Sequence, residues 1–163
     1  MAIDRVEHLP TLPPRASDGH KGQYGFIVVI GGSRGMAGAP ALCGASALRS
    51  GAGLVRILSP EEVQPTVASF EPCCMTYPLP QTSEGVIDFN RARPLIERFV
   101  AEADIVAVGP GLGQSAEIQA LVKWLVQETD KSLVIDADAL NVLAKEIEIL
   151  SDLSRPVVIT PHP

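Results

Sequence analysis

The sequence predicts an α/β fold in which a mainly parallel sheet is flanked by helices in three layers. Short apolar runs rich in β-branched residues alternate with longer segments whose apolar residues recur at helical spacing. Small and polar residues follow the carboxyl ends of several of these runs. Strands separated by helices pair in parallel through right-handed crossovers, so we expect these loops to meet at one edge of the sheet, where α/β proteins bind ligands.

The composition is that of a globular domain and argues against several classes of function. The chain has 163 residues, 46% of them hydrophobic, which suffices for one domain with a core. Its net charge of −6 argues against a nucleic-acid partner, because phosphate binding needs clustered Lys and Arg. No apolar run reaches membrane-spanning length, and the start MAIDRVEHLP lacks a signal-peptide core. We therefore expect a cytoplasmic protein with no membrane contact.

The three cysteines predict neither a disulfide framework nor a zinc site. Cys43 stands alone, and Cys73 and Cys74 are adjacent, so none has metal-ligand spacing. Buried or reduced thiols in a reducing compartment are the expected state.

The first half of the chain begins with a lead-in and a strand–loop–helix unit. Residues 1–20 are polar and carry three prolines, which predicts an extended lead-in before a domain over residues 21–163. Residues 26–30 predict the first strand, and a glycine-rich turn follows over residues 31–38. A helix is expected to begin near Pro40, since proline is well tolerated in a first helical turn.

A second strand is predicted over residues 54–58. Ser59 then has the character of a helix cap, and Pro60 that of a first helical residue, so the next helix is expected to start there. Residues 72–80 contain a short apolar run interrupted by prolines, which predicts an edge strand or a loop.

The second half repeats the alternation of strand and helix. Each strand is continuous in apolar character, as expected for a parallel strand covered on both faces. The predicted strands cover residues 104–108, 132–135 and 156–160, and helices are expected from Ala92, after Ser115 and around Leu140.

The glycine loops match no common nucleotide signature. The segment Gly31–Gly35 does not fit G-x-G-x-x-G, and no Gly-Lys-Ser/Thr follows it, so the dinucleotide fingerprint and the P-loop are both absent. The segment Gly109–Gly113 reads G-x-G-x-G, one residue short of the fingerprint. A tight turn and a close backbone approach to a ligand are both open for such a loop.

Two aspartates and a histidine are the candidate polar groups of the site. Asp136 and Asp138 follow a predicted strand, where a carboxylate can meet Mg²⁺ or a substrate hydroxyl. We expect Asp138 to cap the next helix, which leaves Asp136 as the better ligand candidate. His162 lies between two prolines after the last strand. No Ser/His/Asp or Cys/His arrangement supports nucleophilic catalysis.

Taken together, five blocks of the sequence resemble the ADP/ATP-dependent NAD(P)H-hydrate dehydratase family, whose fold is ribokinase-like. The resemblance runs from about Lys21 to the last residue and keeps both order and spacing. The blocks are KGQYGFIVVIGGSRGMAGAP, ALRSGAGLV, VGPGLG, IDADALN and ITPHP.

The resemblance implies repair of hydrated nicotinamide cofactors, NADHX and NADPHX. In that reaction ADP or ATP, with Mg²⁺, phosphorylates the hydroxyl of the hydrate, and loss of phosphate restores NADH or NADPH. We also expect a homo-oligomer. The matching motifs place a set of residues against the substrate: Ala39, Gly111, Gly113 and His162, with Asp136 and Asn141 shaping the same pocket. Backbone amides near the start of the first helix would meet its anionic parts: those around Gly31, Gly32, Ser33 and Gly38.

The sequence departs from the family pattern after Pro163. Family members continue with Gly-Glu and later carry a Gly-x-Gly-Asp loop, so the expected catalytic aspartate would lie beyond Pro163. We therefore expect a ribokinase-like domain that is incomplete at its C-terminus and inactive alone. Its exposed sheet edge would favour oligomerisation or aggregation. A small-molecule kinase of the same fold, such as a vitamin-precursor kinase, and a non-catalytic nucleotide-binding module are the alternatives.

Overall fold

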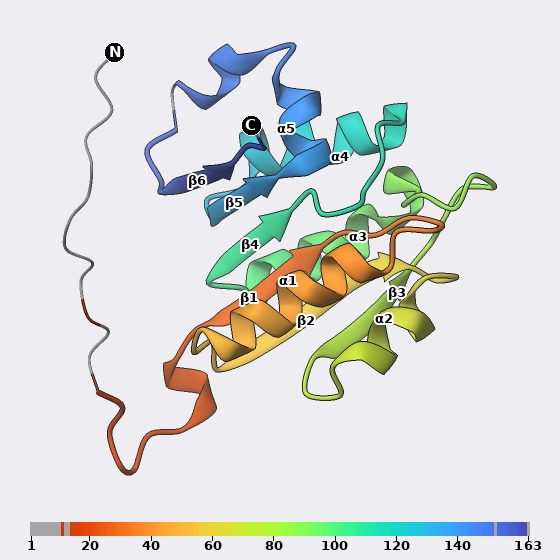
Figure 1. Ribbon diagram of the computed structural model, residues 1–163. Helices are drawn as coiled ribbons and strands as arrows, with labels where there is room; N and C mark the ends of the chain where they lie inside the picture. The colour runs from red at the N-terminus through yellow and green to blue at the C-terminus, as the bar shows by residue number, and fades with distance from the viewer. Residues whose placement is uncertain (1–10, 12–13, 152, 163) are drawn as a thin grey trace.

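A parallel six-stranded sheet lies between two layers of helices in the computed structural model, which describes residues 11, 14–151 and 153–162 (Figure 1). The strand order is β3-β2-β1-β4-β5-β6. The strands are β1 (Phe26–Ile30), β2 (Leu54–Pro60), β3 (Met75–Leu79), β4 (Ile105–Val108), β5 (Ser132–Asp136) and β6 (Val157–Thr160). This arrangement confirms the predicted α/β class.

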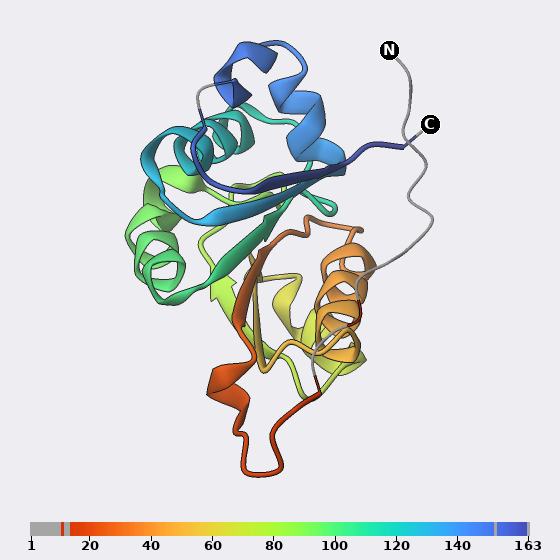
Figure 2. The same ribbon diagram turned by 90° about the vertical axis from the view of Figure 1, so that its left-hand side faces the viewer.

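The helices divide between the two faces of the sheet (Figure 2). Helices α1 and α2 cover one face of the β1–β2 half, and α3, α4 and α5 cover the opposite face. The helices are α1 (Gly38–Arg49), α2 (Gln64–Phe70), α3 (Phe89–Glu102), α4 (Ala116–Glu128) and α5 (Ala137–Leu143), with short 3₁₀ turns η1 (Lys21–Gln23) and η2 (Ile147–Leu150). Among the described residues, no helix is both long enough and apolar enough to cross a membrane.

Strand β1 shows why the central strands read as continuous apolar runs. Successive side chains of a strand point to opposite faces, and both faces of β1 are covered by helices. Val28 and Ile30 therefore pack into the core beneath α3, α4 and α5, whereas Val29 packs into the core beneath α1 and α2. All three side chains are fully buried.

The predicted start of the second helix at Ser59 and Pro60 is wrong. Both residues belong to β2, whose parallel pairing with β3 continues to Pro60 opposite Leu79. Helix α2 begins only at Gln64, with Pro65 in its first turn. Tertiary pairing thus overrides the local capping signal. The proline-containing segment predicted as an edge strand or a loop forms β3, which is one of the two outer strands of the sheet.

The predicted lead-in, residues 1–20, lies partly outside the described residues. Within it, the structure describes residues 11 and 14–20. The described part is exposed, yet Arg15 ties it to the domain. The Arg15 guanidinium lies 4.1 Å from the centre of the Tyr24 ring and donates a hydrogen bond to the carbonyl of Gly51.

Candidate functional site

The strand order creates a natural place for a ligand at the carboxyl edge of the sheet. From β1 the chain builds outward to β2 and β3, then returns to place β4 on the other side of β1. Such a switch point leaves a crevice beyond the carboxyl ends of the two diverging strands. Helix α1 begins close to this crevice, since the loop that follows β1 leads directly into it.

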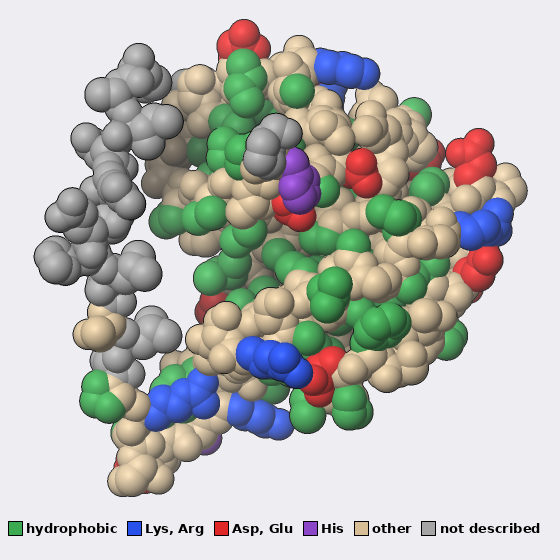
Figure 3. Space-filling model, viewed as in Figure 1, with side chains coloured by type: hydrophobic (Ala, Val, Ile, Leu, Met, Phe, Trp, Pro, Cys, Tyr) green, Lys and Arg blue, Asp and Glu red, His purple; other side chains and the backbone are tan. Residues whose placement is uncertain are grey.

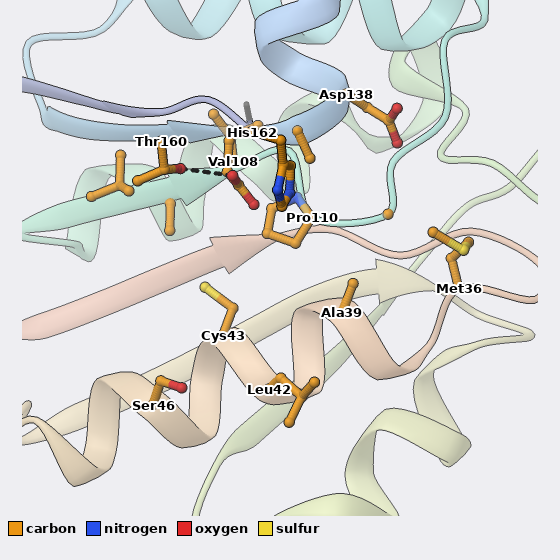
Figure 4. Close-up of a pocket in the computed structure, with 15 residues that line it drawn as sticks. Met36, Ala39, Leu42, Cys43, Ser46, Val108, Pro110, Asp138, Thr160 and His162 are labelled. Carbon is orange, nitrogen blue, oxygen red and sulfur yellow. Dashed lines mark hydrogen bonds between the residues drawn. The ribbon is translucent and has the colours of Figure 1, made fainter.

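A cavity of about 620 Å³ lies beside the switch point, between α1 and the ends of β4, β5 and β6 (Figure 4). Hydrophobic side chains gather in this hollow on the face shown in Figure 3. Its volume lies within the range of cavities that bind drug-sized small molecules. The lining residues are Met36, Ala39, Leu42, Cys43, Ser46, Ala107, Val108, Pro110, Gly111, Val134, Asp136, Ala137, Asp138, Thr160 and His162.

The glycine loop after β1 packs against the loop after β4. The amide of Gly31 donates to the carbonyl of Leu58, and the amide of Gly32 donates to the carbonyl of Pro110 at 2.9 Å. A Cβ on Gly31 would lie 2.6 Å from the same Pro110 oxygen, so only glycine allows this approach. These two amides are paired within the chain and are not free donors toward a ligand.

The amino-terminal end of α1 brings backbone amides to this side of the cavity. Helix α1 begins at Gly38 without a side-chain cap, and Ala39 lines the cavity. The first amides of a helix have no partner within the helix, and its dipole makes this end partly positive. Gly38 itself lines a neighbouring surface groove beside Arg34 and Glu62, which form an exposed ion pair.

The junction of β5 and α5 directs two carboxylates to different partners. Asp136 accepts a hydrogen bond of 2.7 Å from the Thr160 hydroxyl on β6, and Asp138 accepts one of 2.8 Å from the amide of Gly113. Ala137 between them has φ +44°, a left-handed conformation that is rare for a residue with a side chain. The expected capping role of Asp138 is wrong, because α5 already begins at Ala137 and places Asp138 within its first turn.

The cavity has little positive charge of its own. Among the described lining residues, His162 is the single side chain that can become a cation. Burial raises the pKa of the Cys43 thiol, and the negative charge of Asp136 raises it further, so this thiol stays protonated at neutral pH. The lining therefore suits an uncharged polar group more than a phosphate. Within the described part of the chain, no group of three or more candidate metal ligands is found.

The structure brings together four of the residues predicted to contact the substrate: Ala39, Gly111, Asp136 and His162 all line the cavity. Gly113 lies just outside the lining, held by Asp138. Asn141 is exposed on α5 and does not line the cavity.

The prediction missed Cys43 and Thr160. Cys43 lies four residues after Ala39 and hence on the same side of a helix, a spacing that could have identified it. Thr160 is the last residue of β6 and pairs in register with Asp136, which only the strand pairing shows.

Comparison with solved structures places the chain among ribokinase-like α/β proteins. A ribokinase-like superfamily protein from Enterococcus faecalis matches 91% of this chain and 49% of its own, with a TM-score of 0.75 and 28% identity. An ADP/ATP-dependent NAD(P)H-hydrate dehydratase from Bacillus subtilis, co-crystallised with ATP and Mg²⁺, matches 93% of this chain and 63% of its own. Its TM-score is 0.63, and its identity to this chain is 25%.

Residues 27–163 match the family model of the NAD(P)H-hydrate dehydratases, and the chain belongs to that family. A bifunctional NAD(P)H-hydrate repair enzyme from Moorella thermoacetica is 43% identical over 152 residues. An ATP-dependent (S)-NAD(P)H-hydrate dehydratase from Danio rerio is 32% identical over 155 residues. Each match covers 93% of this chain, which spans 28% of the Moorella protein and 44% of the Danio protein.

Proposed function

We propose that this chain is part of an enzyme that dehydrates (S)-NAD(P)H-hydrate to NAD(P)H at the expense of ADP or ATP. One observation carries the proposal: the family match over residues 27–163 includes every segment that lines the cavity, from Met36 on the loop before α1 to His162 after β6. Residues 21–163 would then belong to one ribokinase-like domain, preceded by the lead-in over residues 1–20.

The proposed reaction has two steps. The terminal phosphoryl group of the nucleotide moves to the hydroxyl oxygen of the hydrate. The C–O bond then breaks, phosphate leaves, and loss of a proton from the neighbouring carbon restores the ring double bond. Both steps depend on positioning and on stabilisation of negative charge. We propose that the base is an aspartate that follows Pro163 in the longer protein.

The residues of the cavity would hold the hydrated ring. Its weakly charged, largely apolar lining suits a nicotinamide ring and its amide, with Asp136 and His162 as hydrogen-bonding groups. Ala39 and Gly111 have small or no side chains, so the hydrated ring could come close to the backbone at both residues. The phosphates would lie outside the cavity, toward the partly positive end of α1.

We propose that Mg²⁺ enters with the nucleotide. Mg²⁺ is commonly held by one or two carboxylates together with phosphate oxygens and water, and needs no protein cage. Because Asp136 is assigned to the hydrated ring and the phosphates to the outside of the cavity, phosphate oxygens and water would supply most of the ligands of this ion. Bound Mg²⁺ would offset the charge of the transferred phosphoryl group.

We further propose a cytoplasmic homo-oligomer. The three cysteines are free thiols, which suits a reducing compartment. Strand β6 forms one edge of the sheet, and its Val158 and Ile159 are 55% and 48% exposed. Size-exclusion chromatography with light scattering tests this, because a stable monomer at micromolar concentration would contradict it.

The test of the activity uses NADH hydrate and a version of the protein that extends past Pro163. We expect nicotinamide absorbance to recover only when ADP or ATP with Mg²⁺ is added, and we expect the 163-residue chain to give no recovery. If nicotinamide absorbance does not recover with any nucleotide, the proposal is refuted. A stable phosphorylated product would indicate a kinase instead, and tight nucleotide binding without turnover, measured by calorimetry, would indicate a binding module.

A further inference from the structure

The loop that follows β4, Gly109–Gly113, has one internal hydrogen bond, from the amide of Leu112 to the carbonyl of Gly109. Gly109, Gly111 and Gly113 have φ values of +128°, +67° and +81°, a region that glycine enters freely. A segment with so much backbone freedom depends on contacts with its neighbours for the rest of its order. Because Pro110 and Gly111 line the cavity, those contacts also set the shape of the candidate site.

One side of this loop is held by the loop after β1. The amide of Gly32 donates to the carbonyl of Pro110, and the Ser33 hydroxyl donates to the carbonyl of Gly111 at 2.8 Å. Ser33 is only 8% exposed, so this hydrogen bond is shielded from water. The two bonds fix the carbonyl side of the loop.

The other side is held by the fully buried side chain of Leu112 and by the carboxylate of Asp138. The amide of Gly113 donates to Asp138 Oδ2 at 2.8 Å in a partly buried setting. Figure 4 shows Asp138 beside the loop, on the other side of His162 from Thr160. A carboxylate that accepts a backbone N–H makes one of the stronger protein hydrogen bonds.

The left-handed residue Ala137 explains why two aspartates so close in sequence take separate roles. A regular strand from Asp136 to Asp138 would point both side chains to the same face of the sheet. The φ of +44° at Ala137 breaks that pattern, so Asp136 meets Thr160 while Asp138 meets Gly113. Such backbone strain at a site points to a role for what it orients.

We propose that Asp138 is a positioning residue: through Gly113 it fixes the loop whose Pro110 and Gly111 form one wall of the cavity. The effect of this role on turnover rests on the proposed dehydratase activity. The hydrogen bond between Gly113 and Asp138 does not rest on it. The carboxylate acts here as a hydrogen-bond acceptor, so Asn, which keeps one acceptor oxygen, should replace it in part and Ala should not.

The first test follows the Gly113 amide by NMR in the 163-residue chain. In the wild type we expect a scalar coupling across the hydrogen bond between the Gly113 nitrogen and the Asp138 carboxylate carbon. In Asp138→Ala we expect Gly113 exchange protection to fall at least about tenfold, as loss of a bond to a charged group implies. Asp138→Asn should keep most of the exchange protection of the Gly113 amide. Glu128→Ala, which removes an exposed carboxylate from α4, is the matched control and should change nothing at Gly113.

The second test measures turnover of NADH hydrate by the longer protein. We expect Asp138→Ala to raise KM for the hydrate about tenfold or more, with a smaller change in kcat, and Asp138→Asn to recover most of that loss. An unchanged KM in Asp138→Ala, or Asn no better than Ala, would overturn the positioning role. If the wild type turns over no hydrate, the proposed function fails, and the Gly113 measurements still decide the contact. Should Asp138→Ala fail to fold, absence of the coupling in the wild type would refute the inference.

Discussion

At Gly109 a single added methyl group should both clash with the backbone of a neighbouring strand and strain its own backbone. A Cβ there would lie 1.8 Å from the carbonyl oxygen of Asp136 and 2.7 Å from its carbonyl carbon. Neither atom belongs to a flexible side chain, so β4 and the β5–α5 junction would have to move apart. The φ of +128° adds strain for any residue with a side chain.

We expect Gly109→Ala to lower the free energy of unfolding by about 4 kcal/mol. Backbone strain accounts for about 1 to 3 kcal/mol, and the displaced backbone accounts for the rest. The expected fall in Tm is about 10 °C for a chain of this size. Urea unfolding followed by far-ultraviolet circular dichroism measures the change, provided that the m value stays constant.

Two other glycines separate the cost of backbone strain from the cost of the steric clash. Gly35 has φ +84° but open space where a Cβ would lie, so Gly35→Ala should cost about 1 kcal/mol from strain alone. Gly38 begins α1 with open space and no such φ, so Gly38→Ala should be neutral or gain a few tenths of a kcal/mol. A Gly109→Ala loss no larger than that of Gly35→Ala would refute the steric reasoning.

Three further changes test the packing and the charges. Leu121→Ala in the core should cost about 3 kcal/mol by urea unfolding, whereas Glu128→Ala on the exposed side of α4 should stay within about 0.5 kcal/mol. Asp104→Ala removes the acceptor of the Phe26 amide at 2.8 Å and should cost about 1 kcal/mol, most of which Asp104→Asn should restore. Burial raises the pKa of the Cys74 thiol to about 11. Since the unfolded chain loses this proton first, stability should fall between about pH 9 and 11, and Cys74→Ala should flatten that dependence.

Hydrophobic pattern was enough to predict the sheet but not the ends of its strands. Continuous β-branched runs such as residues 26–30 and 104–108 indicated buried parallel strands, and both form as expected. Ser59 and Pro60 have the residue types of a helix start, yet pairing with β3 keeps them in β2. The partners of Ser59 and Pro60 are Pro78 and Leu79, which lie outside the local sequence window, so no local signal could reveal the pairing.

The site was predicted as a set of loops rather than as a set of contacts. The placement of Asp136 and His162 at the carboxyl edge follows from strand order. The bond between Asp136 and Thr160 depends on the register of β5 and β6, and the bond between Asp138 and Gly113 depends on the left-handed Ala137. Neither register nor this dihedral angle could be read from residue types. The role of Asn141 stays a prediction.

The cavity walls come from segments that are synthesised far apart in time. Met36 and Cys43 lie early in the chain, whereas Thr160 and His162 follow only after five strands have been made. Contacts of such high sequence separation form late in folding, because the chain must first lose the entropy of closing a long loop. Ligand binding at this cavity would therefore report that β6 has joined the sheet. A ligand that binds there would stabilise that late contact by mass action, as any ligand specific to the native state does.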